Sequence, residues 1–362
     1  METIRSKYEK VVLRIATPYA TGTGFYLRDH NLIVTSEFVV RDNPEVIVEA
    51  SGVERQIVPV VFTDAFCDLA LLQPRRPLDL PEIQLAEPSS LAVGDRVLAI
   101  GHSFGFPFMA VEGKVKNLAY RLHAQDFIEI DANLPRGNGG GPVVNIRGEV
   151  QGINTFVAHK PDRFDYALPV AQLSERLLVY EAAGRRPGLR CEHCERRTFA
   201  VEQEQQSCTH CGAAVRFPHQ LPVYYPEGIS QTIEQLIEEV GHPAPLTRRG
   251  PNTWELKQGS ARVNISYYEK NGLIIGDAYL CELPPDNEKP LLEYLLKQNH
   301  DIEGLTFSIR EEAVVLSLLI YDRYFNQDTG SKLFRHLLEE ADHHDNILVE
   351  LFGASWRKTE DD

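Results

Sequence analysis

The first half of this chain is a series of short β-forming runs, each ended by Gly, Pro, Asn or Asp. The runs cover residues 11–15, 24–27, 32–35, 46–49, 57–62, 69–72, 96–100, 127–130, 142–145 and 149–154. No helical periodicity separates them, and many short strands at such spacing are typical of a β-sandwich or β-barrel. One helix is predicted at residues 170–180, where it follows Pro169 and closes the segment.

Four blocks of this segment follow one another in an order that a known family shares. Residues 22–40 lead from a G-T-G turn to T-S-E-F-V-V, and residues 67–72 are C-D-L-A-L-L. Residues 98–105 are L-A-I-G-H-S-F-G, and residues 131–154 contain a run of glycines before a strand. The blocks resemble the trypsin-like serine proteases of the HtrA type. This resemblance implies an all-β, trypsin-like double β-barrel over residues 8–182.

The resemblance also assigns the positions of a catalytic triad. Asp68 stands at the aspartate position, Phe38 at the histidine position and Gly139 at the serine position. Such a triad needs a nucleophile and a base that takes its proton, whereas the carboxylate only orients the base. Because neither Phe38 nor Gly139 can serve, we expect a pseudoprotease and not an enzyme. For a rearranged catalytic site, the available residues by type are Ser36, Ser103, His30 and His102.

Two other parts of the protease machinery are expected to persist. The resemblance assigns an oxyanion-hole-like turn to Gly137, Asn138 and Gly139, whose backbone N–H groups would face a developing negative charge. Residues 149–154 and 165–169 resemble strands that border the substrate, and an extended peptide could pair with them. We therefore expect either a retained peptide groove or a domain that serves only as a scaffold.

Two close pairs of cysteines lie in residues 183–219, which we call the cysteine segment. Two residues separate Cys191 from Cys194 and Cys208 from Cys211, which is the spacing of a zinc ribbon with four cysteine ligands. Four thiolates leave no position for water, so we expect structural Zn²⁺ that allows this apolar-poor segment to fold. A redox-active C-x-x-C is the alternative, but neither pair opens a helix after a strand.

The remaining cysteines and the nearby histidines are predicted to have ordinary roles. Cys67 and Cys281 stand singly in apolar runs, where a free cysteine is most often a small buried residue. His193 and His210 lie inside the cysteine pairs. We expect both to point outwards, because four cysteines already complete a ligand set.

After residue 220 the apolar residues adopt helical spacing and then strand spacing. The predicted helices are residues 229–240, 290–298 and 331–352, with Ser331 as an N-cap, and the predicted strands are residues 253–256, 261–269, 273–283, 305–310 and 313–325. The order α-β-β-β-α-β-β-α defines an α+β domain over residues 220–356. This order resembles the type III secretion chaperone and YbjN-like folds. It implies a surface for extended polypeptide, or a homodimer through this domain.

Aromatic residues of this domain could line such a surface, although an aromatic residue in a strand more often belongs to the core. They are Trp254, Tyr267, Tyr268, Tyr279, Tyr321, Tyr324 and Phe325. His336, His343 and His344 lack carboxylate or cysteine partners at ligand spacing. We expect these three histidines on a solvated helix face.

The net charge of −15 is concentrated in residues 220–362, which disfavours nucleic acids and membranes as partners. Residues 184–218 contain six arginines and four glutamates, and four thiolates with one Zn²⁺ would add −2, which gives a balance of zero. A nucleic-acid-associated module is therefore a disfavoured third hypothesis. Residues 1–10 lack the apolar core of a secretion signal, and we expect a cytoplasmic location. The predicted function is a cytoplasmic scaffold or binding protein with an unidentified protein or peptide partner. The alternative is an active serine-type endopeptidase with a rearranged site.

Overall fold

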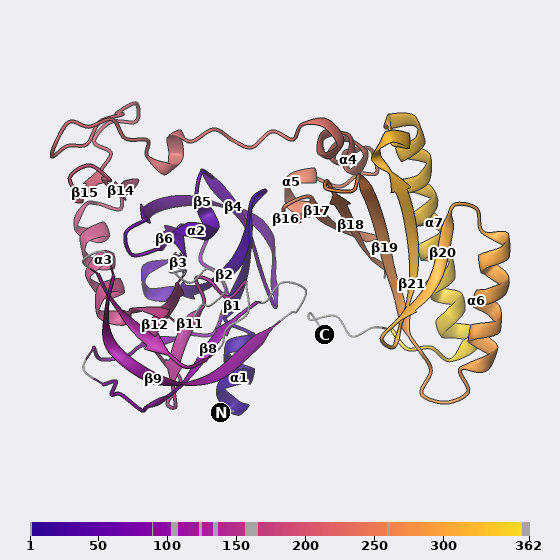
Figure 1. Cartoon of the computed structure of the whole chain (residues 1–362), viewed down its shortest axis with the longest axis horizontal. Coiled ribbons are helices and arrows are strands. Elements are labelled where there is room, and N and C mark those ends of the chain that lie inside the picture. The colour runs from indigo at the N-terminus through magenta and orange to yellow at the C-terminus, as the bar shows by residue number, and fades with distance from the viewer. Residues whose placement is uncertain are drawn as a thin grey trace. The chain divides into compact units, whose positions relative to one another are not determined.

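The computed structural model describes residues 2–88, 90–102, 108–122, 125–132, 137–155, 166–258 and 261–356 (Figure 1). Its contacts divide the chain into two compact units, Met1–Tyr224 and Tyr225–Asp362. The sequence predicted three domains, of which the second is the cysteine segment. In the structure this segment is part of the first unit. No helix in the described ranges is long and apolar enough to cross a membrane.

Six strands of the N-terminal unit close into a first β-barrel in the order β5-β4-β1-β2-β3-β6. The ring closes because β5 pairs with β6. Inward-facing side chains such as Leu13, Ile15 and Val48 are fully buried in its core. The strands are β1 (Val12–Ala16), β2 (Thr21–Leu27), β3 (Leu32–Thr35), β4 (Glu45–Ala50), β5 (Val53–Asp64) and β6 (Leu69–Leu72).

A second ring of six strands has the order β11-β8-β9-β10-β13-β12 and closes between β11 and β12. Its strands are β8 (Arg96–Gly101), β9 (Met109–Leu122), β10 (Gln125–Ile130), β11 (Pro142–Asn145), β12 (Glu149–Thr155) and β13 (Tyr166–Pro169), with β7 (Gln84–Leu85) beside β12. The predicted double β-barrel is confirmed. The strand β9 was not predicted, and most residues of its second half are exposed or only partly buried.

A shared core lies between the two barrels and includes Phe25, Leu98 and Ile153. Helix α3 (Val170–Ala182), close to its predicted range, and the unpredicted helix α1 (Glu2–Glu9) contribute to it. The hydroxyl of Tyr8 on α1 donates a hydrogen bond to the carbonyl of Gly148 at 2.9 Å. The N-terminal residues are thus part of the fold of this unit. Two short helices, α2 (Glu37–Val40) and η1 (Arg28–His30), complete the barrels.

The cysteine segment extends the sheet of the first barrel. It contains β14 (Gly188–Arg190), β15 (Arg197–Phe199) and η2 (Pro218–Gln220), and β14 pairs in parallel with the end of β5. The ring of Phe199 stacks on that of Phe62 in β5, with centroids 5.9 Å apart. Strand pairing and aromatic packing therefore attach the segment to the barrel.

The C-terminal unit is a six-stranded antiparallel sheet in the order β16-β17-β18-β19-β21-β20, packed against helices (Figure 1). The helices are α4 (Gly228–Glu239), α5 (Ala244–Thr247), α6 (Lys289–Asp301), α7 (Gln327–Phe352) and η3 (Asp322–Tyr324). The strands are β16 (Arg248–Gly250), β17 (Thr253–Gln258), β18 (Ala261–Tyr268), β19 (Leu273–Glu282), β20 (Leu305–Arg310) and β21 (Ala313–Tyr321). The predicted order is found, with two short additions, α5 and β16.

Two predicted boundaries of this unit are wrong. Helix α7 is capped by Asn326, whose side chain accepts a hydrogen bond from the backbone of Thr329 at 3.0 Å, and Ser331 lies inside the helix. Asn and Ser are both common N-cap residues. The chain reverses direction directly after β21, so the helix begins at Asn326, the earlier of the two. That reversal also ends β21 at Tyr321, so residues 322–325 do not continue the strand.

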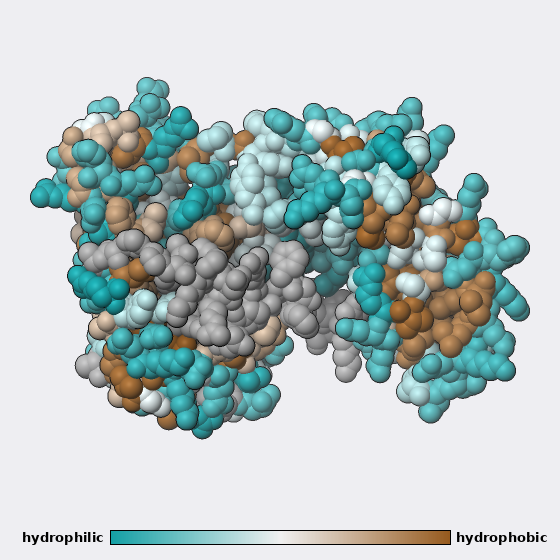
Figure 2. All heavy atoms as spheres, viewed as in Figure 1, coloured by the Kyte–Doolittle hydropathy of each residue, from teal (hydrophilic) through white to brown (hydrophobic). Residues whose placement is uncertain are grey.

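One face of the C-terminal sheet is covered by α7. A Cβ atom at Gly276 would lie 2.8 Å from the side chain of Leu337, so this position faces the helix. The neighbouring Ile275 therefore faces the other side, which we call the open face, with its cross-strand partner Leu319. Leu319 is 56% exposed. Figure 2 shows apolar side chains gathered on the surface of this unit that is toward the viewer.

Candidate functional site

Asp68 lies just before β6 with its side chain buried. Its Oδ1 accepts hydrogen bonds from Ser36 Oγ at 2.5 Å and from the backbone nitrogen of Phe38 at 2.8 Å. Its Oδ2 accepts a hydrogen bond from Thr155 Oγ1 at 2.6 Å. Three donors thus compensate for the burial of this carboxylate. We call Ser36, Phe38, Asp68 and Thr155 the Asp68 site.

Phe38 contributes its backbone nitrogen to this site. It lies on α2 and is 41% exposed, and the guanidinium carbon of Arg41 lies 5.7 Å from the centroid of its ring. The side chain of the preceding residue, Glu37, is buried, which raises its pKa, and hydrogen bonds from Arg41 oppose that shift. The carboxylate of Asp68 is therefore bound by two hydroxyl groups and one amide, with no imidazole near it on α2.

The glycine turn is packed too closely for side chains at two positions. A Cβ atom at Gly140 would lie 2.2 Å from the carbonyl oxygen of Thr23, and one at Gly141 would lie 2.0 Å from that of Ile100. Gly140 also has a φ of 87°, in the left-handed region that favours glycine. Gly139 lies outside that region, so its backbone conformation is open to other residues.

The structure brings Phe38, Asp68 and the glycine turn close together. Asp68 bonds directly to Phe38, and a Cβ atom at Gly140 would lie 2.6 Å from the backbone nitrogen of Ser36. The turn is held by a hydrogen bond from the nitrogen of Thr23 to the carbonyl of Gly139 at 2.9 Å. Gly137 has a φ of 100°, and Asn138 is buried.

The predicted pairing of a peptide with residues 149–154 is wrong for the described part of that strand. One edge of β12 pairs with β11 from Pro142 to Val144. The other edge pairs with β13 over Gly152–Thr155, because both strands are needed to close the barrel. Of the second predicted strand, residue 165 lies outside the described residues, and residues 166–169 are the partner of β12.

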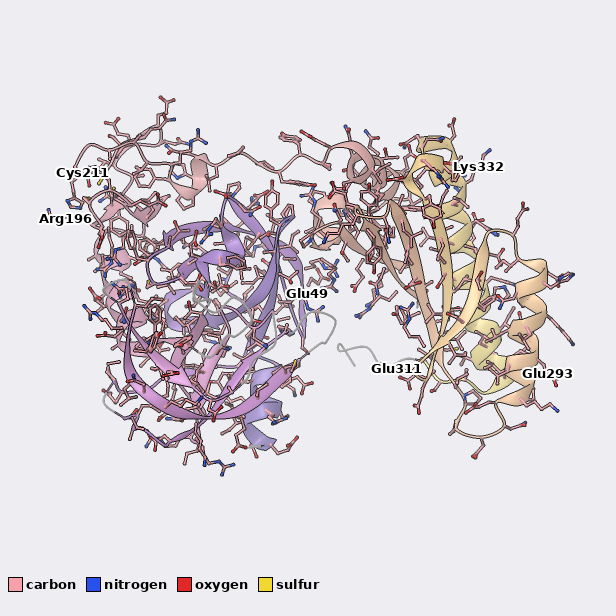
Figure 3. The ribbon with its side chains drawn as sticks, in the orientation of Figure 1. Glu49, Arg196, Cys211, Glu293, Glu311 and Lys332 are labelled. Carbon is pink, nitrogen blue, oxygen red and sulfur yellow. The ribbon has the colours of Figure 1, made fainter. Side chains whose placement is uncertain are left out.

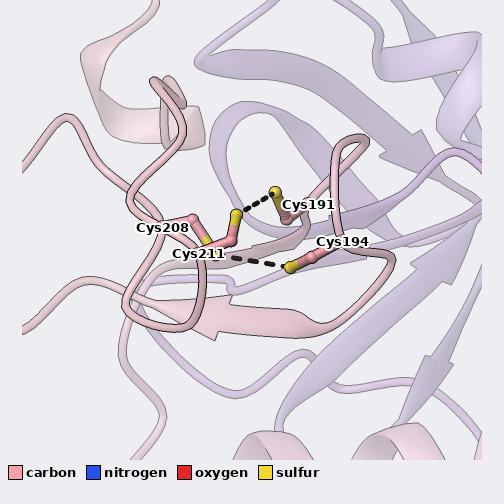
Figure 4. A group of neighbouring side chains, drawn as sticks. All are labelled: Cys191, Cys194, Cys208 and Cys211. Atoms are coloured by element: carbon pink, nitrogen blue, oxygen red, sulfur yellow. Dashed lines mark hydrogen bonds between the residues drawn. The ribbon is translucent and has the colours of Figure 1, made fainter.

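The four paired cysteines lie close together (Figure 4). All four sulfur atoms are within 4.8 Å of one another, with 3.8 Å between Cys191 and Cys211 and 3.8 Å between Cys194 and Cys208. A tetrahedron with metal–sulfur bonds of about 2.3 Å has edges of about 3.8 Å. The six cysteines of the chain form no disulfide. The four sulfur atoms could therefore hold a metal ion.

The two cysteine pairs have the same turn. The nitrogen of Glu195 donates to the carbonyl of Cys191 at 2.8 Å, and the nitrogen of Gly212 donates to that of Cys208 at 2.9 Å. Glu195 and Gly212 both have positive φ, 57° and 73°. A backbone hydrogen bond from Ala213 opposes the shift of Cys211, but contacts with the neighbouring thiols raise its pKa to about 12. Cys208 shifts the other way. Desolvation opposes its ionisation, but the backbone N–H groups of His210 and Cys211 and the neighbouring thiols lower its pKa to about 6. Such a turn favours the thiolate form that a metal requires.

We predicted that the histidines inside the cysteine pairs point away from the four sulfur atoms, and a contact of His210 agrees with this. The ring Nε2 of His210 is 3.0 Å from the carbonyl oxygen of Arg197, so this nitrogen is already hydrogen-bonded outside the sulfur cluster. The lone cysteines Cys67 and Cys281 are fully buried, as predicted.

The prediction for the C-terminal histidines is wrong for His344. This side chain is buried, with its Nδ1 2.9 Å from the hydroxyl of Tyr294 and its Nε2 3.3 Å from Glu340. Its partner Tyr294 belongs to α6, which packs on α7, and the helix pattern alone did not show that contact. The aromatic residues divide between core and surface: Trp254 and Phe325 are buried, whereas Tyr268, Tyr321 and Tyr324 are exposed.

Thr155 and Ser36 were not predicted as partners of Asp68. Thr155 is 87 positions from Asp68 along the chain, and Ser36 was considered only as a substitute nucleophile. The sequence signal for Thr155 was its place as a hydroxyl residue at the end of a buried strand. That signal does not identify the acceptor.

The double barrel and the Asp68 site define a class of protein. Residues 22–153 match the family described as Trypsin-like peptidase domain. The N-terminal unit therefore carries a trypsin-like peptidase domain, and its homologues are proteases of the HtrA and DegP type.

Individual relatives show how much of the chain is shared. The chain is 33% identical over 170 residues to a DegP-like periplasmic serine endoprotease of Pseudomonas fulva, which covers 45% of this chain and 35% of the relative. It is 31% identical over 170 residues to Serine protease HTRA4 of Homo sapiens, with the same coverage. The solved serine endoprotease from Yersinia pestis has 26% sequence identity and a TM-score of 0.45, and covers 52% of this chain and 69% of that one. The chain thus spans 35% of the length of either curated relative.

Proposed function

We propose that this chain is a non-catalytic homologue of HtrA-type proteases that binds a protein or peptide. The observation that carries the proposal is the state of Asp68, whose two oxygens accept hydrogen bonds from Ser36, Phe38 and Thr155. The resemblance would have this carboxylate orient a histidine. Instead it holds three segments of the barrels together, which is a structural role.

The alternative, a peptidase with a rearranged site, lacks support from the described candidates. Ser36 has no exposed surface and donates its hydroxyl to Asp68, so a substrate could not reach it. His30 pairs with Glu181 at 2.7 Å, on α3. The backbone of His102 is hydrogen-bonded to Thr23, and Ser103 lies outside the described residues.

A protein partner at the C-terminal unit is the second part of the proposal. The open face of the sheet carries apolar side chains at Ile275 and Leu319, and the unit as a whole is acidic. Such a face suits a polypeptide partner or a second copy of this chain better than a nucleic acid. The resemblance of this unit to type III secretion chaperone and YbjN-like folds points the same way.

The cysteine segment completes the proposal as a zinc ribbon with structural Zn²⁺. Four sulfur donors at tetrahedral spacing are the ligand set of such an ion. A cytoplasmic location fits this assignment, because reduced thiols persist in a reducing compartment.

The test is one incubation with two readouts. The zinc-loaded protein would be treated with a fluorophosphonate probe for reactive serine and with fluorescently labelled unfolded casein. A non-catalytic binding protein should remain unlabelled and should raise the fluorescence anisotropy of casein without producing fragments. Labelling or cleavage by the unmodified protein would disprove the absence of catalysis.

Two variants serve as controls for the assignment of positions. The double variant Phe38→His, Gly139→Ser restores the residues that the resemblance assigns to these positions, and the backbone at Gly139 permits the change. Labelling of this variant would support the assigned positions. The matched variant Phe38→His, Gly139→Ala lacks a nucleophile and should stay unlabelled.

A further inference from the structure

Arg190 connects the cysteine segment to the loop that carries Asp68. It is the last residue of β14 and directly precedes Cys191, and its side chain is 11% exposed. Its Nε donates a hydrogen bond to the carbonyl of Glu195 at 2.8 Å, within the turn of the first cysteine pair. The guanidinium group of Arg190 is thus oriented by that turn.

The other side of Arg190 contacts residues 64–68, the end of β5 and the turn that leads to β6, which we call loop 64–68. Its guanidinium carbon lies 4.4 Å from the centroid of the Phe66 ring, and its Nη1 lies 3.6 Å from Oδ1 of Asp64. Asp64 is fully buried and also pairs with the buried Arg176 of α3 at 3.4 Å. Two arginines from different elements therefore neutralise this carboxylate.

The loop ends at Asp68, only four residues after Asp64, so it has little freedom to move independently of Arg190. Asp68 has a left-handed backbone with φ of 55°, and Cys67 between these aspartates is fully buried. A non-glycine residue keeps such a conformation only where its surroundings hold it. The surroundings here are the Asp68 site on one side and Asp64, Phe66 and Arg190 on the other.

We propose that the cysteine segment is a metal-dependent clamp on loop 64–68, in which Arg190 transmits the state of the metal site to Asp68. This inference rests on the proposed metal binding. With a metal bound, the turn at Cys191–Glu195 is rigid and holds Arg190 against Asp64 and Phe66. Without the metal, the apolar-poor cysteine segment loosens, Arg190 loses its anchor at Glu195, and the loop and the Asp68 site become more mobile. By linkage, a loosened loop also weakens metal binding.

The experiment compares hydrogen–deuterium exchange of the full chain with Zn²⁺ and after treatment with a chelator. The reporter is the amide of Phe38, which bonds to Asp68, together with the amides of residues 66–70. Removal of Zn²⁺ should speed their exchange by about tenfold or more, whereas β19 in the C-terminal unit should be unaffected. Unchanged exchange at the reporters, with faster exchange only in residues 191–212, would overturn the proposal.

Variants test the route through Arg190. Arg190→Met keeps a long side chain but removes the charge, and in the zinc-loaded protein it should reproduce the fast exchange of the metal-free state. Arg196→Met is the matched control, because Arg196 is an exposed residue of the same turn at the outer edge of the segment (Figure 3). If Arg190→Met does not fold, Phe66→Leu removes the cation–π contact alone and should give a smaller change in the same direction. Slow exchange in a folded Arg190→Met or Phe66→Leu protein would contradict the route.

A Co²⁺ titration separates this inference from the proposed function. Tetrahedral thiolate ligation gives Co²⁺ strong charge-transfer absorption. Absence of that absorption would disprove the metal site itself. Its presence, with exchange at Phe38 independent of the metal, would disprove only the clamp.

Discussion

At the scale of single residues, the buried carboxylate of Asp68 is the most informative group in the chain. Its hydrogen-bond donors come from α2, from the residue before α2 and from the end of β12. A buried carboxylate without donors would cost several kcal/mol, so these contacts are needed for the fold whether or not the site binds a ligand. The residue type at position 68 is consistent with a family aspartate, but its partners give it a structural role.

Replacement of Asp68 should therefore destabilise the protein. We expect Asp68→Ala to lower the free energy of unfolding by about 2–4 kcal/mol, because it leaves two buried hydroxyl groups and one amide without their acceptor. Urea unfolding followed by circular dichroism measures this change. Asp42→Ala is the matched control. Asp42 also has a positive φ, of 60°, but it is exposed, so its replacement reports the effect of the backbone conformation without that of buried hydrogen bonds. Equal losses for the two variants would mean that the hydrogen bonds of Asp68 contribute nothing.

At the scale of elements, α6 does two things in the C-terminal unit. It covers His344 on α7, and it blocks the edge of the sheet. The Asn299 side chain accepts a hydrogen bond from the nitrogen of Phe307 at 2.6 Å and donates one to its carbonyl at 3.0 Å. Because Phe307 lies on the edge strand β20, a second chain cannot add to the sheet at this residue. A homodimer through this unit is therefore expected to use the open face and not the edge at Phe307.

The packing of α6 on α7 predicts a pH dependence. Burial lowers the pKa of His344, and Glu340 only partly opposes this effect. The folded state therefore favours the neutral ring, and the unfolded chain takes up the proton more readily. Stability should be full above the unfolded pKa of about 6.5 and should fall as the pH drops below it.

Tryptophan fluorescence can measure this dependence, because Trp254 and Trp356 are the two tryptophans of the chain and both lie in the C-terminal unit. The urea midpoint should decrease from pH 7.5 to pH 5, and His344→Gln should flatten this decrease. His300→Gln changes an exposed histidine of α6 that has no part in the shift at His344, and it should leave the slope unchanged. Identical slopes for His344→Gln and the unmodified protein would show that another group controls the pH response.

At the scale of the whole molecule, the chain has two units, and the four paired cysteines lie in the first. The cysteine segment belongs to the first unit through the pairing of β14 with β5, and the second unit has its own core between the sheet and its helices. Stabilisation by a bound ion acts only on the unit whose folded state binds it. The two units are therefore expected to respond differently to a chelator.

Removal of Zn²⁺ should destabilise the first unit alone. With free metal at a hundred times its dissociation constant, binding contributes about 2.7 kcal/mol, or about 5–10 °C in the melting temperature of a unit of this size. Calorimetry should show one transition shifted by the chelator. The transition seen by tryptophan fluorescence should not move. A common shift of both transitions would mean that the units unfold together.

Much of the architecture could be predicted from the sequence, because the relevant signals are local. Alternating apolar residues and turn residues predicted most barrel strands, and the spacing of Cys191, Cys194, Cys208 and Cys211 predicted that they gather at one place. Strand alternation and a two-residue spacer each determine geometry over a few residues. The same local signals predicted the element order of the C-terminal unit.

Tertiary structure alone decided which distant residues meet. Thr155 reaches Asp68 because the packing of the two barrels brings the end of β12 close to the residue before β6, and His344 is buried because α6 packs over α7. Arg190 contacts Asp64 and Phe66 because β14 adds to β5, a pairing that no local pattern encodes. Residue type and spacing thus determined which groups the chain carries. The strand pairing and helix packing determined which of them became partners, because contacts between distant residues depend on how the whole chain folds.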